Sequence, residues 1–392
     1  MKSFVIGGGA SGLTAAITAA RNNEDVTIIE KNNKLGKKLL LTGNGRCNYF
    51  NTNMSLDNFY SSGNINRFIN DDNINKVKSF FYSIGIIGKV KDGYYYPYSN
   101  TASAIHNLLL KEIDELNINI INEEVIDINN NDNKFFIKTN NNEYNCDKLI
   151  LSTGGITYQK TGSDGFGYEI LKKFNHTINP LKPALVPLVT KENLKKVSGI
   201  RIDAKLDLFV DKILVSTQIG EAQLTDYGIS GICTMNLSRF INLDKENIIK
   251  IDFLPDFDEL KEFIIQRNKK LKNRSIIELL EIIINYKLLY FIFEKLHINP
   301  DSKWDELSNE KQELIIKNIK EFELTIIDTK GLDFAQTTSG GVVLEEVKDN
   351  CESKLVKNLF ITGELLDIDA ICGGYNLTIA WITGLLAGDA HD

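Results

Sequence analysis

Cysteine and histidine are scarce in this chain, and their spacing excludes several kinds of site. Among 392 residues there are five cysteines, and no two are spaced as C-x-x-C. An odd number without paired spacing argues against a disulfide framework, a zinc knuckle or a dithiol redox pair, and favours a reducing, cytoplasmic compartment. The four histidines are scattered, so we expect no metal site. These residues are Cys47, Cys146, Cys233, Cys351, Cys372, His106, His176, His297 and His391.

Clusters of positive charge and long uninterrupted apolar runs are also lacking. No group of Lys and Arg stands apart from matching acids, and the net charge is −7, so we expect no nucleic-acid partner, since phosphate contacts need a basic patch. Residues Ile371–Gly388 form the longest apolar stretch near a chain end, but glycines and Asn376 interrupt it. That stretch predicts a buried helix and no membrane anchor. The first residues predict a strand, so we expect no secretory signal.

The most informative segment that is present runs from Val5 to Glu30 and reads VIGGGASGLTAAITAARNNEDVTIIE. It predicts a strand, a glycine turn, a helix and a second strand that ends in an acid. Gly7 allows the tight turn, Gly9 lets a pyrophosphate approach the backbone, and Gly12 lets the helix pack on the sheet. The phosphates would lie on the free N–H groups of the helix start. Glu30 would accept hydrogen bonds from a ribose and repel a 2′-phosphate, so the segment predicts a dinucleotide site.

The order of patterns along the chain predicts an α/β fold. We expect a Rossmann-like FAD-binding domain, with a parallel sheet and a β-meander, formed by residues 1–187 and 331–392. The inserted part would comprise a β-rich domain at 188–255 and a helical subdomain at 256–330, with a boundary at the prolines between 180 and 187. The predicted elements are helices within 64–85, 101–117, 275–296 and 375–387, meander strands at 125–128, 135–139 and 142–144, and sheet strands at 147–152 and 358–362.

Two further glycine turns follow predicted sheet strands. Thr153 and Gly154 follow one strand, and the GELLD segment beginning at Gly363 follows the other. Ligands bind at the carboxyl ends of strands in open α/β sheets, so these turns belong to one site. An Asp in the last loop can hold ribityl hydroxyls, and the helix that begins after Gly374 can direct its N–H groups at a flavin carbonyl. The far end of the chain therefore favours FAD over NAD.

In these motifs the chain resembles the aminoacetone-oxidase-like bacterial FAD flavoproteins, one of which is assigned to reducing an unsaturated bile-acid intermediate. The resemblance covers essentially the whole length. It rests on GGGASGLTAA near the start, LGKKLLLTGNGRCN at 35–48, YYYPYSNTASA at 94–104, STGGITYQKTGSDGFGY at 152–168, PALVPL at 183–188, TDYGISG at 225–231, TTSGGVVLEEV at 337–347, ESKLVKNLFITGELLD at 352–367 and GGYNL at 373–377.

The resemblance implies a set of FAD contacts along both ends of the chain, with the inserted part closing over the flavin and substrate entering between the two parts. The adenosine half would lie along the first glycine turn and Glu30, and the ring along the last helix start. The implied cofactor residues are Gly7, Gly9, Ala10, Ser11, Gly12, Glu30, Lys31, Lys38, Gly45, Arg46, Cys47, Asn48, Val125, Thr153, Gly154, Gly363, Glu364, Asp367, Gly374, Tyr375, Asn376 and Leu377.

The chain departs from the family pattern at several positions. The family usually has His where this chain has Asp226, Pro at Ile232 and at Gln159, and Gln at Thr378. Because an Asp lacks the near-neutral pKa of an imidazole, a mechanism that relies on that His is in doubt. The candidate catalytic residues are Asp226, Tyr227 and Tyr375, with Tyr158 as a further acid or base candidate.

Three other side chains have a chemical and a structural interpretation. Cys47 is either a thiol beside the flavin or, as we favour, a packed residue. Arg46 is either a contact to the flavin or a substrate anion, or part of an ion pair that braces its loop. His176 follows a predicted helix, where its cation would favour the helix dipole.

Together these patterns predict an FAD-dependent oxidoreductase that moves a hydride between flavin N5 and a small organic substrate. No second G-x-G-x-x-G follows a strand, so we expect transient NAD(P)H binding in the flavin cleft, or oxygen as the acceptor. Alternatives are an oxygen-using amine oxidase and a flavin-binding RNA-modification or regulatory protein. The sequence predicts neither the substrate nor the oligomeric state.

Overall fold

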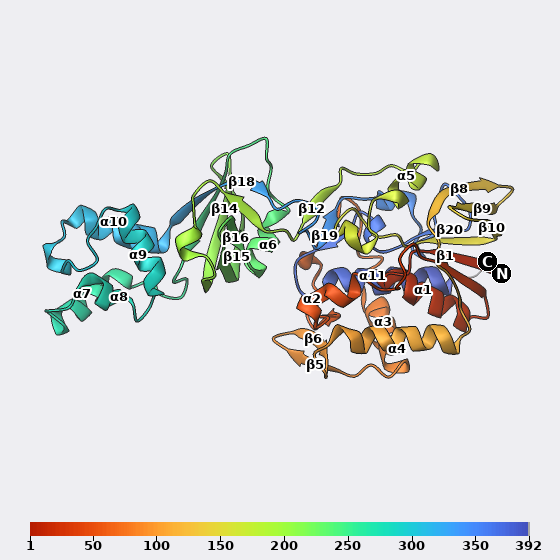
Figure 1. The fold of residues 1–392 in the computed structure, drawn as a ribbon, viewed down its shortest axis with the longest axis horizontal. Coiled ribbons are helices and arrows are strands. Elements are labelled where there is room, and N and C mark those ends of the chain that lie inside the picture. Colours follow the sequence, from red (N-terminus) through yellow and green to blue (C-terminus); the bar gives the residue numbers. More distant parts are fainter. Residues whose placement is uncertain (391–392) are drawn as a thin grey trace. The chain divides into compact units, whose positions relative to one another are not determined.

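The computed structural model describes residues 1–390 and divides the chain into two compact units (Figure 1). Unit 1 contains residues 1–184 and the segment from residue 335 onward, whereas unit 2 contains residues 185–334. Both ends of the chain therefore build one unit, and the middle of the chain builds the other.

Unit 1 is organised around a sheet in the order β20-β11-β1-β2-β7, and each neighbouring pair is parallel. Its central strands are almost continuously buried, because the helix Ala10–Arg21 and the β-meander both pack against the sheet. Their Val, Ile and Leu side chains suit that setting. The strands are β1 (Lys2–Ile6), β2 (Asp25–Ile29), β7 (Asn119–Ile121), β11 (Lys148–Leu151) and β20 (Leu359–Ile361).

Smaller antiparallel sheets complete the strand content of unit 1. The meander pairs β10 with β9 and β9 with β8, and the alternating burial of β9 shows that one of its faces packs inward. The strands are β8 (Val125–Asn131), β9 (Lys134–Thr139), β10 (Glu143–Cys146), β3 (Phe50–Asn51), β6 (Tyr94–Pro97), β5 (Gly88–Lys91), β4 (Phe59–Tyr60), β21 (Asp369–Ala370), β12 (Lys182–Ala184) and β19 (Thr337–Ser339).

The helices of unit 1 begin and end close to the predicted ranges, with one clear difference. The segment predicted as helical from residue 64 becomes a helix only at Asp71, because the Asn70 side chain accepts a hydrogen bond from Asn73 N at 3.0 Å and caps the helix there. The helices are α1 (Ala10–Arg21), α2 (Thr42–Gly45), α3 (Asp71–Ser83), α4 (Ala102–Glu115), α5 (Phe166–Lys173) and α11 (Tyr375–Asp389).

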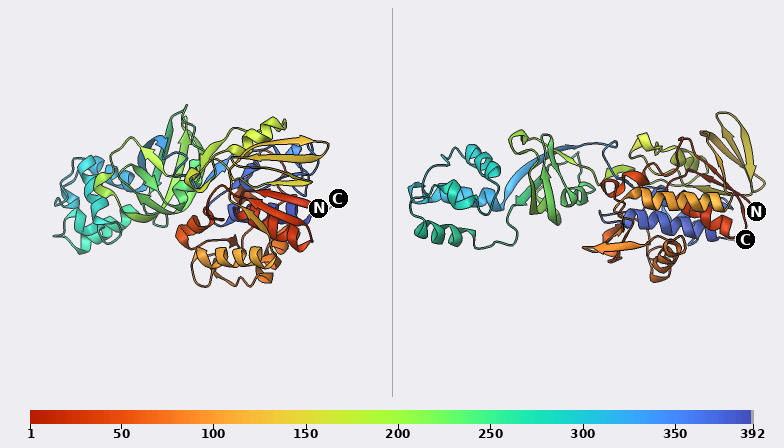
Figure 2. Two further views of the ribbon diagram at one scale, coloured as in Figure 1. Left: turned by 45° about the vertical axis from the view of Figure 1, so that its right-hand side comes forward. Right: turned by 60° about the horizontal axis from the view of Figure 1, so that its bottom comes forward.

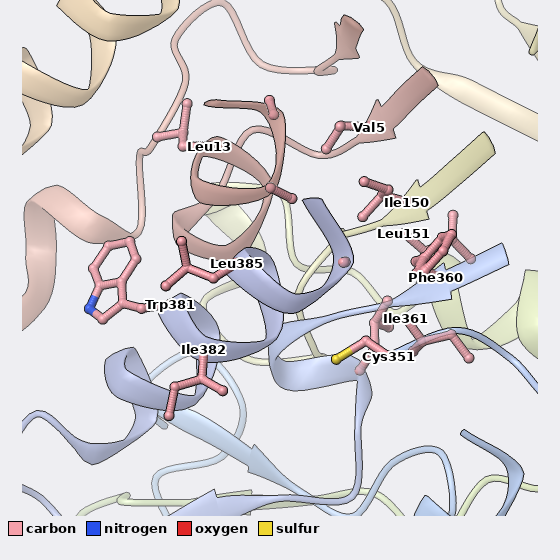
Figure 3. Packing of buried hydrophobic residues seen from close by; sticks show 14 of the residues in the cluster. Val5, Leu13, Ile150, Leu151, Cys351, Phe360, Ile361, Trp381, Ile382 and Leu385 are labelled. Atoms are coloured by element: carbon pink, nitrogen blue, oxygen red, sulfur yellow. The ribbon is translucent and has the colours of Figure 1, made fainter. Parts of the chain in front are cut away.

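Helices α1 and α11 pack against each other through glycines. A Cβ added to Gly384 would lie 2.5 Å from Ser11 O, and one added to Gly388 would lie 2.5 Å from Ala15 O, so the backbones are in direct contact. From the first contact to the second, the residue number increases by four on both helices, so the two helices run in the same direction. Figure 3 shows α11, which carries Trp381, Ile382 and Leu385, next to α1, and the right-hand view of Figure 2 shows the first and last helices of the chain side by side.

Unit 2 contains a closed barrel in the order β13-β16-β15-β14-β17-β18. Along β14, buried residues alternate with partly exposed ones, and Leu206 and Leu208 point into the core with no exposed surface. The strands are β13 (Leu188–Thr190), β14 (Arg201–Val210), β15 (Ile213–Leu224), β16 (Gly228–Ser230), β17 (Asn247–Asp252) and β18 (Phe322–Thr329).

The helices of unit 2 share one hydrophobic core with the barrel. The run predicted as a helix from Ser275 to Leu296 is wrong, because it divides into two helices. The Asn285 side chain accepts a hydrogen bond from Lys287 N at 3.0 Å, and this local bond starts a new helix. The helices are α6 (Ile232–Ser238), α7 (Leu260–Lys270), α8 (Ile276–Leu280), α9 (Tyr286–Lys295) and α10 (Asn309–Lys320).

The predicted fold class is confirmed. The parallel sheet combines strands from both ends of the chain, the meander follows β7, and the inserted part contains an antiparallel barrel. The finer division of the insertion at residues 255 and 256 stays a prediction.

Candidate functional site

The first glycine turn has the geometry that the fingerprint requires. Gly7 has φ +98°, and a Cβ there would lie 2.6 Å from Ser152 O, while a Cβ on Gly12 would lie 2.0 Å from Gly7 O. Around Gly9, by contrast, an added Cβ would meet only Ser152 O, at 4.0 Å. Two glycines are therefore needed for packing, and the third leaves the backbone open to an approaching ligand, as a pyrophosphate needs.

The acid at the end of β2 is held in place by backbone groups. Glu30 accepts hydrogen bonds from Gly8 N and Asn32 N, both at 2.8 Å, so its carboxylate lies beside the glycine turn. The next residue, Lys31, forms an ion pair with Asp164 at 2.5 Å. Glu30 is thus placed at the carboxyl end of the strand, where a ribose hydroxyl would be received.

We predict that Glu30→Ala weakens retention of FAD by about tenfold, since one charge-assisted hydrogen bond is worth about 1.5–3 kcal/mol and 1.4 kcal/mol corresponds to tenfold. The measurement is the FAD dissociation constant of the purified protein. Glu30→Gln, which keeps the shape and loses the charge, is the matched control and should retain more flavin. Unchanged affinity in both variants would remove Glu30 from the cofactor site.

The turn after β11 lies next to the first glycine turn. Gly154 has φ +76°, and a Cβ there would lie 2.6 Å from Ser163 Oγ. Thr153 Oγ1 is buried without a hydrogen-bond partner among the described residues, and a Cβ on Gly167 would lie 2.2 Å from it. Thr153 and Gly154 are therefore closely packed between the sheet edge and α5.

Lys38 and Glu364 are brought together from opposite ends of the chain. Lys38 Nζ lies 2.7 Å from Glu364 Oε2 and 3.0 Å from Thr157 Oγ1. Glu364 Oε1 also accepts hydrogen bonds from Thr338 N at 2.8 Å and from Thr157 Oγ1 at 3.1 Å. Both carboxylate oxygens are thus used within the protein, so Glu364 fixes the shape of its loop.

Asp367 is likewise engaged by neighbouring side chains. Its Oδ2 accepts hydrogen bonds from Ser62 Oγ at 2.5 Å, Ser62 N at 3.1 Å and Asn179 Nδ2 at 2.8 Å. The sequence signalled the acid in the loop but not these partners, which lie 305 and 188 residues away. Its proposed role on the ribityl chain stays a prediction.

The start of α11 is formed by two glycines with left-handed backbone. Gly374 has φ +87°, and a Cβ there would lie 2.8 Å from Phe50 O. In the amide orientation that satisfies its hydrogen bonds, Asn48 donates to Phe50 O at 2.9 Å and accepts from Gly374 N at 3.2 Å. Asn51 donates to Gly373 O at 2.8 Å. Asn48 thus positions the helix start, although the sequence pattern placed it only in the flavin region.

Asn376 and Tyr375 are turned in different directions. The Asn376 amide exchanges two hydrogen bonds with the Ala370 backbone, at 3.0 and 2.9 Å, so only its backbone N–H is directed to the helix start. Tyr375 is 4% exposed and its hydroxyl oxygen accepts a hydrogen bond from Asn58 Nδ2 at 3.1 Å. Burial, followed by the nearby Tyr94, raises the pKa of Tyr375. Leu377 is partly buried on the first turn.

The two helix starts together form a cradle for an elongated ligand. Neither α1 nor α11 has a side-chain cap or an acidic residue in its first turn, so both carry positive partial charge. Ser11 of α1 lies against Gly384 of α11. Ser11 is one residue after the first residue of α1, whereas Gly384 is nine residues after the first residue of α11. At 1.5 Å per residue, α11 therefore starts about 12 Å before α1. A ligand with phosphates at one point and a ring carbonyl further on matches this arrangement, so these residues fit FAD.

Other predicted cofactor residues lie around this cradle. Ala10 and Ser11 begin α1, and a Cβ on Gly363 would lie 2.7 Å from Ser11 Oγ. Cys47 has no exposed surface, and burial raises the pKa of its thiol to about 12, which agrees with a packed residue. Val125 is buried at the start of the meander. Contact of these residues with FAD stays a prediction.

The candidate catalytic residues are divided between the units. Asp226 and Tyr227 lie in unit 2, in the turn between β15 and β16, whereas Tyr375 lies in unit 1. Asp226 is exposed, whereas Tyr227 is half-buried, and Lys330 Nζ lies 4.6 Å from the centre of the Tyr227 ring. Their action on one substrate stays a prediction.

The packing of Tyr94 and Tyr375 around Gly373, near the start of α11, was not predicted from the sequence. A Cβ on Gly373 would lie 2.6 Å from the ring of Tyr375 and 3.1 Å from that of Tyr94. Burial raises the pKa of Tyr94, as do the charges of Cys372, Tyr96 and Asp92. The only sequence signal was the YYYP motif, which indicated resemblance but no role.

His176 is not the helix-end cation that we expected. Its side chain is buried, its Nε2 lies 2.8 Å from Ser353 Oγ, and its Nδ1 lies 3.0 Å from Glu346 Oε2. Ser353 Oγ accepts from Leu355 N and Val356 N, so its hydroxyl donates to the imidazole and Nδ1–H donates to Glu346. Ser353 is 1% exposed, so the cluster is structural.

The pKa of His176 is lowered by burial, despite the opposing effect of Glu346, and this gives a pH dependence. Because the unfolded chain binds the proton more readily, we predict that stability is lost as the pH falls below the ordinary value of about 6.5. The loss is at most about 1.4 kcal/mol per pH unit, since one proton is involved. Urea unfolding at pH 7.0 and 5.5 measures it, and His176→Asn should flatten the difference. An equal pH dependence in the variant would contradict this assignment.

Two kinds of feature are absent from residues 1–390. No group of three or more His, Cys, Asp or Glu side chains there is placed to hold a metal ion, and His391 lies outside the described residues. Within the same residues, no helix has the length and apolar character needed to cross a membrane.

Comparison with known proteins agrees with this architecture. Residues 1–390 match the family described as "HI0933-like protein Rossmann domain". The chain is 37% identical to the 3-dehydro-bile acid delta(4,6)-reductase of Clostridium scindens, over 98% of each chain. It is 25% identical to the ribosomal RNA dihydrouridine synthase of Escherichia coli, over 97% of this chain and 95% of that one, and 27% identical to the Haemophilus influenzae enzyme of the same name, over 97% and 96%.

Solved structures share the fold at low identity. A 3-ketosteroid-delta4-(5alpha)-dehydrogenase from Rhodococcus jostii RHA1 matches 99% of this chain and 96% of its own, with a TM-score of 0.50 and 13% identity. A flavocytochrome c3 fumarate reductase matches 99% of this chain and 77% of its own, again with a TM-score of 0.50 and 13% identity. The resemblance found in the sequence is confirmed: the chain belongs to the HI0933-like Rossmann family of FAD-dependent oxidoreductases.

Proposed function

We propose that this protein is an FAD-dependent reductase that adds hydrogen to a carbon–carbon double bond conjugated with a ketone, on a small apolar ring substrate. The observation that carries the proposal is the 37% identity to a 3-dehydro-bile acid delta(4,6)-reductase over 98% of both chains. In that relative's name, 3-dehydro denotes a ketone and delta(4,6) denotes ring double bonds. The coarser class, a flavoprotein oxidoreductase, follows from the family itself.

The residues around the two helix starts would bind the cofactor, and FAD, when bound, supplies hydride chemistry. The open backbone at Gly9 and the start of α1 would receive the phosphates, while the N–H groups at the start of α11 would face the ring. Tyr375 is a candidate proton donor, because a tyrosine hydroxyl is protonated at neutral pH, and burial raises the pKa of Tyr375 further from neutrality. Asp226 and Tyr227 are the alternatives in unit 2.

We propose NAD(P)H as a transient electron donor. The glycine segment GSDGFG at 162–167 follows a short 3-10 turn, Gln159–Thr161, and no strand directly precedes it. It therefore lacks the context of a second dinucleotide fingerprint. A nicotinamide that binds only briefly beside the flavin needs no such domain.

The test is anaerobic. Flavin released from the purified protein is first identified as FAD, and NADH or NADPH is then added to see which bleaches its absorbance. The reduced protein is mixed with a 4,6-dien-3-one bile acid, and we expect rapid return of the oxidised flavin spectrum with formation of a product that has one double bond fewer, since reduced FAD carries two electrons. The corresponding saturated ketone is the control and should leave the flavin reduced. No reoxidation by the dienone would overturn the proposal.

A second candidate is a ribosomal RNA dihydrouridine synthase, because two relatives at 25% and 27% identity carry that name. The net charge of −7 argues against a phosphate-rich substrate. Incubation of the reduced protein with unmodified ribosomal RNA, followed by mass spectrometry for dihydrouridine, distinguishes the two. An amine oxidase would instead consume oxygen when given an amine and would not reduce the dienone.

A further inference from the structure

The loop formed by Thr42–Cys47, which includes the short helix α2, has an unusual backbone conformation. Gly43, Asn44, Gly45 and Cys47 all have positive φ, between +56° and +79°. The loop is nevertheless fixed, because Cys47 N donates to Thr42 O at 3.0 Å and the Cys47 side chain is fully buried. Glycine adopts positive φ freely, so the strain falls on Asn44 and Cys47. Such strain costs about 1–3 kcal/mol per residue and persists where the surroundings enforce it, often at ligand sites.

This loop presents Arg46 on its exposed side. Arg46 Nε donates to Gly43 O at 3.3 Å, and the guanidinium carbon lies 5.4 Å from the centre of the Tyr96 ring. No carboxylate among residues 1–390 forms an ion pair with it. The other two cations of the predicted cofactor set do have acids, since Lys31 pairs with Asp164 and Lys38 pairs with Glu364. The interpretation of Arg46 as half of an ion pair that braces the loop is therefore wrong.

The surroundings of Arg46 leave room for a ligand. A Cβ added to Gly45 would meet no atom within 4 Å, so the neighbouring backbone is open. Two residues further on, Asn48 accepts from Gly374 N at 3.2 Å, which ties the loop to the start of α11. The terminal nitrogens of Arg46 are therefore available as hydrogen-bond donors. They lie on a rigid loop that contacts the start of α11, which is the predicted ring end of the cofactor site.

We infer that Arg46, steadied by Tyr96, is the residue that binds a carboxylate of the substrate. This rests on the proposed function, because the substrate is taken to be an apolar ring compound that also carries an acid. A planar guanidinium matches a carboxylate through two parallel hydrogen bonds, and the Tyr96 ring keeps its plane oriented. The assignment sets specificity: acids bind, and their neutral esters bind poorly.

The experiment uses the FAD holoenzyme and a saturated 3-oxo bile acid with its methyl ester, titrated while flavin absorbance is followed. We expect the wild type to bind the acid at least about tenfold more tightly than the ester, because hydrogen bonds to a charged group are worth about 1.5–3 kcal/mol. Arg46→Met should abolish that preference and leave ester binding unchanged. Arg46→Lys should restore only part of it, since a point charge lacks the two-pronged geometry.

Lys91→Met is the matched control, because it removes an exposed cation from the neighbouring strand β5 and should leave the preference intact. Loss of FAD from Arg46→Met would assign Arg46 to the cofactor and overturn the inference. Equal binding of acid and ester by the wild type, or binding of neither, would overturn it as well. If the acid binds through Arg46 but the dienone is not reduced, the inference stands and the proposed function fails.

Discussion

Gly374→Val is expected to purify as a folded protein with almost no flavin. The backbone at Gly374 has φ +87°, a conformation that a β-branched residue adopts only with strain. The new side chain would also begin 2.8 Å from Phe50 O and 2.9 Å from the side-chain amide of Asn48. Strain of about 1–3 kcal/mol corresponds to a loss of FAD affinity of about 5- to 150-fold if the bound state needs this geometry. The ratio of flavin to protein absorbance, with circular dichroism to confirm folding, measures the effect.

Gly85→Val is the matched control for that variant. Gly85 has φ +76° and lies in unit 1, but a Cβ there would meet no atom within 4 Å. It therefore shares the backbone strain without the collision, and should lose stability while keeping its flavin. A folded Gly374→Val protein with the flavin content of the wild type would show that the start of α11 does not approach the ring.

Lys148→Met is expected to lower the free energy of unfolding by about 3–5 kcal/mol, the usual effect of removing one partner from a buried ion pair. Lys148 Nζ lies 2.9 Å from Glu24 Oε1, and the two side chains are 1% and 4% exposed. The ammonium also donates to Ala390 O at 2.9 Å. The variant would remove the Lys148 ammonium from the buried Glu24 carboxylate, which is the main source of the loss. Urea denaturation followed by circular dichroism measures it.

Two comparisons separate this explanation from simple loss of a contact. Lys173→Met removes half of an exposed pair with Asp127, whose side chains are 42% and 41% exposed, and should cost less than about 1 kcal/mol. The double variant Lys148→Met with Glu24→Leu should recover much of the lost stability, because both charges are then gone. If the double variant is no more stable than the single one, packing rather than charge is responsible.

The sequence predicts the framework of unit 1 well because that framework depends on local patterns. The buried strands β1 and β11 are short apolar runs followed by glycine turns, and the meander alternates along β9. Closure of the barrel in unit 2 was not predicted, since it depends on pairing of β13 with β18 across more than a hundred residues. The break in the run 275–296 was missed because a single side-chain bond from Asn285 decides it.

The candidate site was predictable where the backbone itself sets the requirement. Gly7, Gly12 and Gly374 are needed because a Cβ would strike backbone atoms, and this demand is visible as glycine in the sequence. The roles of polar side chains were harder to predict. Glu364 and Asn376 carry the right chemistry for a ligand, yet both are hydrogen-bonded to other parts of the protein. Their partners are set by tertiary structure, which no local motif records.

The position of β20 and α11 at the end of the chain sets when the cofactor site can exist during synthesis. Strand β20 is the last strand of the parallel sheet to be synthesised, and it pairs with β11. Helix α11 packs against α1 through its own glycines, Gly384 and Gly388. Until both are made, the small residues on α1 lack their packing partner and the ring end of the cradle is missing. We therefore expect FAD to bind only after nearly the whole chain has been translated, and a chain that ends before residue 375 to be unable to hold it.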